Sequence, residues 1–436
     1  FHPYCNAGGG GERVLWESVR TVQQRYPGLR CCVYTGDAAA GEEILRSAQR
    51  AFGIGEFAEE VHFVFLRQRR WVEAARWPVF TMVGQSLGSL ILGLEAILQL
   101  NPEVYIDTMG YAFTIPFFRL LGGCRTAAYV HYPTISTDML SALHRTGPAF
   151  NNRQFIARSK VLTEGKALYY RLFARLYGWA GAYSQCTMVN SSWTHGHIMQ
   201  LWDSEPWLVY PPCDVDPLWD IPLQPRQKTI LSIAQYRPEK NHALQLHAFA
   251  ELLQRHPEYR AQGARLVMIG GCRHEDDERR FGELQALAQR LGVAECVSIE
   301  KNVPFERKKQ LLAEAVAGLH SMSNEHFGIG IVEFMAAGAV PVAHRSGGPL
   351  LDIVSPAAVI FEDELVGEDA VGFLAATEAE YAEALHQIFR LPQAKLQAMQ
   401  QRARDSSRRY SAEAYCTRFQ EAMGPVCSVA TDKKGQ

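Results

Sequence analysis

Short apolar runs alternate along the chain with longer segments in which apolar residues recur at helical spacing. The runs are three to six residues long, and amphipathic stretches such as Glu12–Tyr26, Ala243–Arg255 and Asp277–Leu291 lie between them. This alternation predicts parallel sheets that are covered by helices on both faces. The expected strands, in chain order, are Cys31–Thr35, Val61–Leu66, Val104–Asp107, Ala127–His131, Thr187–Asn190, Ile230–Ala234, Leu266–Gly270, Val297–Ile299, Val316–Ser321 and Val340–Ala343.

The strands form two series, separated by Tyr210–Lys228, a segment with five prolines and little periodicity. A chain of 436 residues also suits two domains of about 200 residues each better than one core. We therefore predict an α/β protein with two doubly wound domains. The expected boundaries are 1–210 for the first domain, 211–228 for the linker, 229–395 for the second domain, 396–425 for a terminal helix and 426–436 for a tail. The pattern leaves open whether the helix, read as Leu396–Met423, packs on its own domain or on the first one.

Composition narrows the class of protein. Hydrophobic residues make up 47% and charged residues 21%, so the chain can bury large cores and is not a disordered one. The net charge of -2 gives no general case for binding nucleic acid. The ten cysteines show neither CxxC pairs nor metal-ligand spacing, which favours free thiols in a reducing compartment over a disulfide framework.

The first chemical motif is the glycine run Gly8, Gly9, Gly10 and Gly11, directly before the helical stretch that starts at Glu12. Glycines let a backbone approach a ligand closely, and amides at a helix start attract anions. The run fits neither a P-loop nor a dinucleotide fingerprint, which disfavours a dehydrogenase. A flexible turn is the alternative. Because such loops normally follow a strand, we expect a strand or an anchor upstream of Phe1.

Two further motifs follow strand ends, where open parallel sheets bind ligands. Arg237 and Lys240 come after the first strand of the second series and are suited to a diphosphate. His131 ends a strand of the first series and could polarise a sugar hydroxyl or a phosphate. A solvated charged loop and a structural histidine are the respective alternatives.

The strongest motif is Ser323–Gly338, which runs from a strand end into a helix. Phe327, Gly328 and Ile329 would present backbone amides at the helix start. Glu333 lies among apolar neighbours, where a carboxylate needs hydrogen bonds that ribose hydroxyls could supply. The alternative is a pair of surface glutamates, Glu325 and Glu333, near an N-terminal turn. Val340–Pro349 is read as a strand followed by a Gly-Gly turn, which would form another loop at the same sheet edge.

These residues together resemble the retaining glycosyltransferases of family four, which have the GT-B fold. Glu325 and Glu333 are separated by seven residues, as in that family, with Phe327 and Gly328 inside the spacing. The order of glycine loop, histidine, basic loop and double glutamate covers nearly the whole chain. Longer strings, such as FHPYCNAGGGGERVLW, YVHYPTIS, SIAQYRPEKNH and EHFGIGIVEFMAAGAVPVAH, are similar to the eukaryotic α-1,2-mannosyltransferases of dolichol-linked oligosaccharide assembly.

The resemblance implies a role for each matching residue. Glu325 would lie beside the transferred sugar, Glu333 would hold the ribose, and Lys240 would neutralise the leaving diphosphate. The amides of Phe327, Gly328 and Ile329 would contact the sugar or the phosphate, and the loop that contains Val303 would meet the base. Glycines 8–11 and His131 would line the acceptor side. Many members carry an arginine where this chain has Gln235. Either Arg237 takes the place of that arginine, or phosphate binding relies more on Lys240.

The resemblance also implies the fold and the activity. The fold would consist of two Rossmann-like domains around an interdomain cleft, with a terminal helix that crosses back to the first domain. GDP-mannose would be the donor and no metal or other cofactor would be needed. The fourth and fifth mannoses would be added with retention to a dolichyl-diphosphate-linked trimannosyl chitobiose on the cytoplasmic face of the endoplasmic reticulum, with other mannosyltransferases of the pathway as candidate partners. The alternatives are another donor or acceptor, or a catalytically silent subunit of a membrane assembly.

A lipid-linked acceptor predicts a membrane-facing surface on the first domain. Arg69, Arg70, Trp71 and Trp77 combine basic and aromatic residues, as interfacial segments do. Val79–Leu98 is mostly apolar and reads either as a membrane-embedded helix or as a buried one. Arg153–Trp179 is a second basic and aromatic stretch. An ordinary amphipathic helix is the alternative for each.

Overall fold

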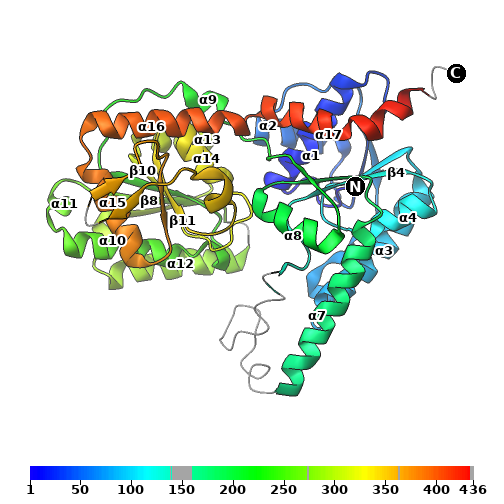
Figure 1. Cartoon of the computed structure of the whole chain (residues 1–436), viewed down its shortest axis with the longest axis horizontal. Coiled ribbons are helices and arrows are strands. Elements are labelled where there is room, and N and C mark those ends of the chain that lie inside the picture. The colour runs from blue at the N-terminus through cyan, green and yellow to red at the C-terminus, as the bar shows by residue number, and fades with distance from the viewer. Residues whose placement is uncertain (138, 140–159, 273, 362–363, 433–436) are drawn as a thin grey trace. The chain divides into compact units, whose positions relative to one another are not determined.

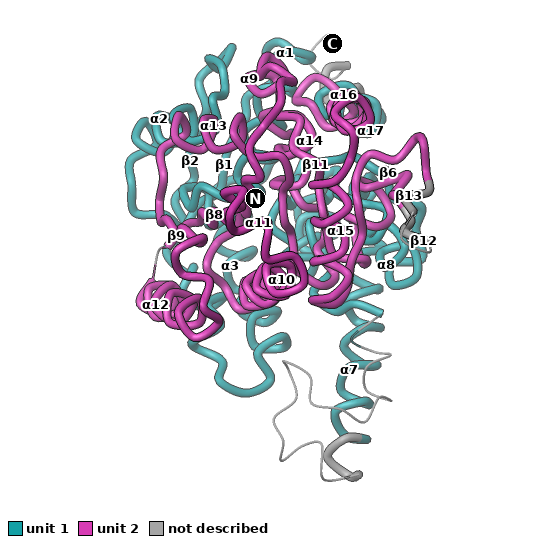
Figure 2. The backbone as a smooth tube through the Cα atoms, turned by 90° about the vertical axis from the view of Figure 1, so that its left-hand side faces the viewer, with its two compact units in different colours: residues 1–212, 415–436 teal, residues 213–414 magenta. Residues whose placement is uncertain are grey.

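The structure is a computed structural model that describes residues 1–137, 139, 160–272, 274–361 and 364–432. The chain divides into two compact units (Figure 2). The first comprises residues 1–212 together with 415–436, and the second comprises residues 213–414. Both are built on parallel sheets with helices between consecutive strands, so the predicted α/β class is confirmed.

The second unit contains a six-stranded sheet in the order β14-β11-β10-β7-β8-β9. Every pair in it is parallel, and β10 and β7 align Ala317 with Ile230. The inner strands are almost wholly buried, as their near-continuous apolar sequences require. The strands are β7 (Thr229–Ile233), β8 (Arg265–Gly270), β9 (Val297–Lys301), β10 (Ala317–His320), β11 (Val340–His344) and β14 (Phe373–Ala375). A separate antiparallel pair consists of β12 (Val359–Phe361) and β13 (Glu364–Val366).

Helices cover both faces of this sheet (Figure 1). One group packs α10 against α12 and α15, and the other packs α14 against α13 and α16. From β7 the chain moves outward through β8 and β9, and then returns to the other side of β7 to build β10 and β11. The strand order therefore reverses between β7 and β10. The helices are α9 (Asp216–Trp219), α10 (His242–Arg255), α11 (Glu258–Ala261), α12 (Glu275–Arg290), α13 (Phe305–Glu314), α14 (Ile329–Ala337), α15 (Glu378–Arg390) and α16 (Gln393–Ser407).

The first unit contains a four-stranded parallel sheet, β3-β4-β5-β6, and a parallel pair, β1-β2. Side chains of β4 alternate between two cores: Ala127 and Tyr129 pack with α17, whereas Ala128 and Val130 pack with α3, α4, α7 and α8. The strands are β1 (Cys32–Thr35), β2 (His62–Phe65), β3 (Val104–Asp107), β4 (Arg125–Val130), β5 (Cys186–Val189) and β6 (Trp207–Leu208). The helices are α1 (Gly10–Arg25), α2 (Gly41–Phe52), α3 (Thr81–Gln99), α4 (Thr114–Leu120), α7 (Lys160–Gly181), α8 (Ser192–Trp202) and α17 (Ala412–Asp432).

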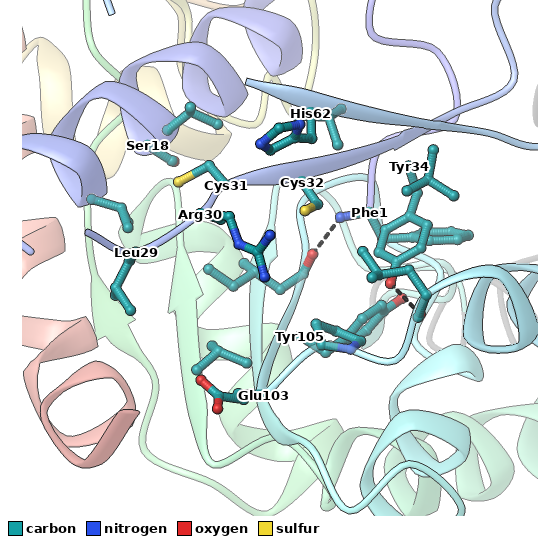
Figure 3. A pocket seen from close by; sticks show the side chains of 18 of the residues that line it. Phe1, Ser18, Leu29, Arg30, Cys31, Cys32, Tyr34, His62, Glu103 and Tyr105 are labelled. Carbon is teal, nitrogen blue, oxygen red and sulfur yellow. Dashed lines mark hydrogen bonds between the residues drawn. The ribbon is translucent and has the colours of Figure 1, made fainter. Parts of the chain in front are cut away.

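The segment Phe1–Pro3 lies between β1 and β3. The Phe1 nitrogen donates to the Ile106 carbonyl at 2.6 Å, and the His2 amide donates to the Tyr34 carbonyl at 3.1 Å. Beyond this segment the two strands border a cavity of about 570 Å³ (Figure 3), whose lining includes Arg30–Tyr34 and Leu100–Ile106. None of the predicted site residues lines it. The cavity is a gap between two strand edges, and we assign no ligand to it.

All ten predicted strands are present, with ends within two residues of the expected ones. The predicted terminal helix is two helices, α16 and α17, separated by a short turn at Arg408–Tyr410. α17 packs on α1, where the Tyr415 hydroxyl lies 2.6 Å from the Ser18 hydroxyl. The last predicted segment, 426–436, begins within α17, and residues 433–436 lie outside the described residues.

Replacement of Tyr415 tests this packing. Ser18 donates to the Val14 carbonyl, so it keeps one bond when Tyr415→Phe removes the phenol. We expect Tyr415→Phe to lower the free energy of unfolding by about 1 kcal/mol and Tyr415→Ala by about 3–5 kcal/mol, because Tyr415 is fully buried. Urea unfolding measures both. Arg418→Ala, at an exposed position of the same helix, is the control and should change the value by less than about 0.5 kcal/mol; a Tyr415→Ala value as small would contradict the packing.

Candidate active site

The predicted donor-site residues of the second unit gather at the carboxyl ends of the central strands. Lys240 follows β7 and Glu325 follows β10, the two neighbouring strands between which the strand order reverses. In open parallel sheets ligands bind at this point, because the loops from the two strands diverge there. Arg237 is exposed in the loop after β7, and Val303 is half-buried in the loop after β9. The sheet therefore brings four predicted residues from three strands to one edge.

Lys240 and Glu325 form an ion pair through the lysine Nζ and the Oε2 of the carboxylate. Glu325 is only 8% exposed. Its Oε2 also lies 3.0 Å from Nε2 of His320, and its Oε1 accepts the His326 amide at 3.2 Å. Burial alone raises the pKa of Glu325, but the His320 hydrogen bond and the charge of Lys240 outweigh it and hold the pKa well below its usual range. The site thus contains an ionised carboxylate beside a lysine.

Ser321 ties the two loops together. Its hydroxyl donates toward the carbonyl oxygens of Lys240 and Asn241, at 2.8 and 2.9 Å, and accepts from the Gln245 side-chain amide at 2.9 Å. Asn241 adopts a left-handed conformation, with φ of 47°, which asparagine tolerates better than most residues. The backbone of Lys240 is therefore fixed against the end of β10.

The loop that carries Glu325 rests on the Gly347–Gly348 turn after β11. The Gly348 amide donates to the Glu325 carbonyl at 2.8 Å, and the Ser346 hydroxyl accepts the Asn324 amide at 2.7 Å. A Cβ atom on Gly347 would lie 2.3 Å from the Glu325 carbonyl oxygen. The turn that read as a mere loop in the sequence is therefore a support for the Glu325 loop.

Glu333 lies in the second turn of α14 and is 6% exposed. Its carboxylate contacts the Lys308 ammonium of α13 at 2.6 Å. The predicted burial is thus confirmed, but a charged partner within the protein was not foreseen. α14 begins at Ile329, directly after Gly328, whose φ of 115° suits glycine. Phe327 is buried with its ring 5.2 Å from that of Tyr410.

The first unit brings the glycine loop and His131 together. A Cβ atom on Gly11 would lie 3.6 Å from Nε2 of His131, and the same nitrogen lies 3.1 Å from the Thr108 carbonyl. The Gly9 amide donates to the Glu12 carboxylate at 2.6 Å. This amide is therefore already used by a side chain of α1, whereas Gly8 and Gly10 are exposed.

The basic and aromatic residues before α3 contact one another and the helix. Arg69 pairs with Asp37 at 2.6 Å, and the Trp77 indole donates to the Trp71 carbonyl at 2.8 Å. Arg70 is exposed. Of the stretch Arg153–Trp179, residues 153–159 lie outside the described residues. α3 is long and apolar enough to cross a membrane by length and composition, with a third of its most apolar window buried.

Three contact residues escaped the sequence analysis: His320, Ser321 and Lys308. His320 and Ser321 carry a weak signal, because polar residues close an otherwise apolar strand there. Lys308 carries none, since its position on α13 matters only once α13 packs on α14. Within the described ranges, no group of three or more His, Cys, Asp or Glu side chains could hold a metal ion.

Solved structures share this architecture. The Anabaena protein HepE, crystallised with UDP and glucose, superposes with a TM-score of 0.62 at 14% identity and covers 96% of this chain and 97% of its own. A glycosyltransferase from Rickettsia africae gives a TM-score of 0.63 at 12% identity, with 96% of each chain covered. The chain therefore has the fold of the GT-B glycosyltransferases.

Sequence relatives narrow the class. The profile described as ALG11 mannosyltransferase N-terminus matches residues 1–202, and that described as glycosyl transferases group 1 matches residues 219–406. The protein from Mus musculus named GDP-Man:Man(3)GlcNAc(2)-PP-Dol alpha-1,2-mannosyltransferase is 50% identical over 426 residues, which cover 96% of this chain and 85% of the relative. Its namesake from Dictyostelium discoideum is 43% identical, over 98% of this chain and 84% of its own length. The chain belongs to this mannosyltransferase family, as the resemblance predicted.

Two glycines with matching backbone geometry test the support of the Glu325 loop. Gly347 and Gly292 have φ of 62° and 67°, but a Cβ atom on Gly292 would meet nothing within 4 Å. We expect Gly292→Ala to lower the free energy of unfolding by about 1 kcal/mol through backbone strain alone. Gly347→Ala should cost at least about twice as much, because its methyl group would collide with the Glu325 carbonyl. Equal costs in urea unfolding would show that the turn does not support the loop.

Proposed function

We propose that this protein transfers mannose from GDP-mannose, with retention, to a dolichyl-diphosphate-linked trimannosyl chitobiose in α-1,2 linkage, and that it adds the fourth and fifth mannoses. The names of relatives that are 43–50% identical over nearly the whole chain support this donor and acceptor. The observation that carries the proposal is the Lys240–Glu325 pair at the switch point of the sheet. It supplies both charges that the transfer of a sugar from a diphosphate requires.

Lys240, Arg237 and the amides at the start of α14 stabilise the departing GDP. A transition state with oxocarbenium character develops negative charge on the leaving diphosphate and positive charge on the sugar ring. Lys240 meets the first charge, and the ionised Glu325 lies beside it to meet the second and to orient the mannose. Because the leaving group and the acceptor use the same face of the sugar, configuration is retained. We expect this chemistry to need no metal ion.

Glu333 holds the ribose hydroxyls, and Val303 lies in the loop that meets the base. A buried carboxylate with one lysine partner keeps acceptor capacity for a diol. Lys308 offsets its charge, which lowers the cost of burying Glu333 before the donor binds. In the first unit, His131 and the loop of glycines 8–11 contact the acceptor sugar.

Replacement of Glu325 tests the function. With a synthetic lipid-linked trimannosyl acceptor and GDP-mannose, wild type should give products with one and two added mannoses by mass spectrometry, and excess chelator should not prevent this. Glu325→Gln should lower kcat at least about 100-fold, because the carboxylate charge is lost at the reacting sugar. Glu314→Gln, at a surface ion pair of the same unit, should retain activity.

Transfer only from another nucleotide sugar would contradict the assignment of GDP-mannose as the donor. Full activity of Glu325→Gln would contradict the proposed role of Glu325 in transfer. If wild type transfers sugar from no donor, the alternative of a catalytically silent subunit is favoured.

The membrane surface is formed by apolar stripes on α3 and α7, next to the turn that contains Arg69, Arg70, Trp71 and Trp77. Phe80, directly before α3, packs edge-on against Tyr169 of α7, with ring centroids 5.4 Å apart. The residues of each stripe recur every three or four positions, so they lie on one face of the helix, and all of their side chains are exposed. They are Leu87, Ile91, Leu94 and Leu98 on α3, and Leu168, Leu172, Leu176 and Trp179 on α7. Such exposed stripes are unusual for a surface that meets only water. The acceptor is lipid-linked, so we assign the stripes to the cytoplasmic face of the endoplasmic reticulum membrane.

Liposome flotation tests this surface. Replacing Leu87, Ile91, Leu94 and Leu98 with Ser should lower the liposome-bound fraction at least about tenfold, because each of these side chains contributes about 1.5–3 kcal/mol when buried in lipid. The control replaces Leu350 and Leu351, which are exposed in the second unit. Flotation that is unchanged by the α3 substitutions, or lowered equally by the control, would contradict the assignment.

A further inference from the structure

His320 is a buried histidine at the end of β10, and it is only 4% exposed. Its Nε2 lies 3.0 Å from Oε2 of Glu325. Its Nδ1 has no hydrogen-bond partner within the described part of the chain. An apolar side chain could close this strand without the cost of about 1–3 kcal/mol that a buried, unpaired polar atom carries. The contact with Glu325 is therefore the feature that accounts for a histidine here.

We propose that His320 is a positioning residue that holds Glu325 in the orientation needed for sugar transfer. The inference rests on the proposed function, because it gives Glu325 its place beside the transferred mannose. It adds a residue outside the double-glutamate motif and assigns separate tasks to the two carboxylate oxygens.

The position of His320 on a central strand fixes its backbone. β10 lies inside the sheet, where His320 aligns with Ala343 of β11, and the His320 carbonyl accepts the Tyr381 hydroxyl at 2.7 Å. Glu325 instead stands on a loop whose orientation depends on its contacts. A side chain on a strand fixes a neighbour more closely than one on a loop does, because its own backbone has less freedom. His320, held by the sheet, therefore restricts the orientation of the Glu325 carboxylate.

The hydrogen-bond roles follow from the charge of Glu325. An ionised carboxylate only accepts, so Nε2 of His320 carries the proton and donates it. Lys240 contacts the same oxygen, Oε2. Oε1 has one longer bond, from the His326 amide at 3.2 Å, and keeps capacity for a substrate hydroxyl. His320 and Lys240 together hold Oε2, and Oε1 becomes the oxygen that meets the sugar.

Matched replacements of His320 separate positioning from packing. His320→Leu keeps bulk but removes the donor, and we expect kcat for mannose transfer to fall about 10- to 100-fold with little change in KM for GDP-mannose. His320→Gln carries an amide nitrogen where Nε2 lies and should stay within about threefold of wild type. His320→Asn reaches only to the Nδ1 position and should behave like leucine. His386→Leu is the control and should leave kcat unchanged, because His386 of α15 forms its hydrogen bond with Tyr259.

The pH profile supplies a second readout. The charged or titratable groups near the His320–Glu325 pair are Lys240, His242, His344 and Tyr381, and Arg345 acts on His344. Burial lowers the pKa of His242 to about 4 and also lowers that of His344, so both stay neutral near pH 7. Loss of the His320 bond lets the pKa of Glu325 rise. The acidic limb of kcat/KM should therefore move to higher pH in His320→Leu and stay in place in His320→Gln.

The outcomes divide clearly. If wild type transfers no mannose from GDP-mannose, the proposed function fails and His320 is not at issue. If wild type is active, equal kcat for wild type and His320→Leu overturns the positioning role. Equal loss in His320→Leu and His320→Gln also overturns it, because packing would then be the only property that matters. If His320→Leu does not fold, the comparison of His320→Gln with His320→Asn decides, and equal activity of these two overturns the proposal.

Discussion

The ion pair between Lys240 and Glu325 is the interaction on which the second unit's site depends. It joins the loops after β7 and β10, and these loops are neighbours only because the strand order reverses between those two strands. The pair places a positive charge beside the buried Glu325 carboxylate, which offsets the cost of burying that carboxylate. These contacts hold the pKa of Glu325 well below its usual range and fix the orientation of its carboxylate, and the proposed function assigns this charge to the stabilisation of the sugar during transfer.

The surrounding contacts each hold one part of this pair. Ser321 fixes the backbone of Lys240 from the end of β10, and the Gly347–Gly348 turn supports the loop of Glu325 from β11. His320 contacts the carboxylate itself. Every support comes from a central strand or from the loop directly after it. The same sheet that forms the core thus determines the geometry of the site.

The sequence was enough to predict the fold and to select the two glutamates that we assign to the candidate site. Strand ends agreed within two residues because buried parallel strands are short apolar runs with clear limits. Glu333 was recognised because a carboxylate among apolar neighbours needs a partner. The break between α16 and α17 was missed, since Ser411 and its neighbours interrupt the helix without a proline or glycine. Lys308, His320 and the support from Gly347 depend on contacts between segments distant in sequence, which spacing along the chain does not encode.

Hydrogen–deuterium exchange with GDP-mannose tests the location of the donor site most directly. The account predicts that saturating GDP-mannose slows exchange in residues 235–241 and 321–330, which carry Lys240 and Glu325. It predicts no change in residues 28–34, which border the cavity between β1 and β3. Slower exchange confined to that cavity, with residues 235–241 and 321–330 unaffected, would contradict the account.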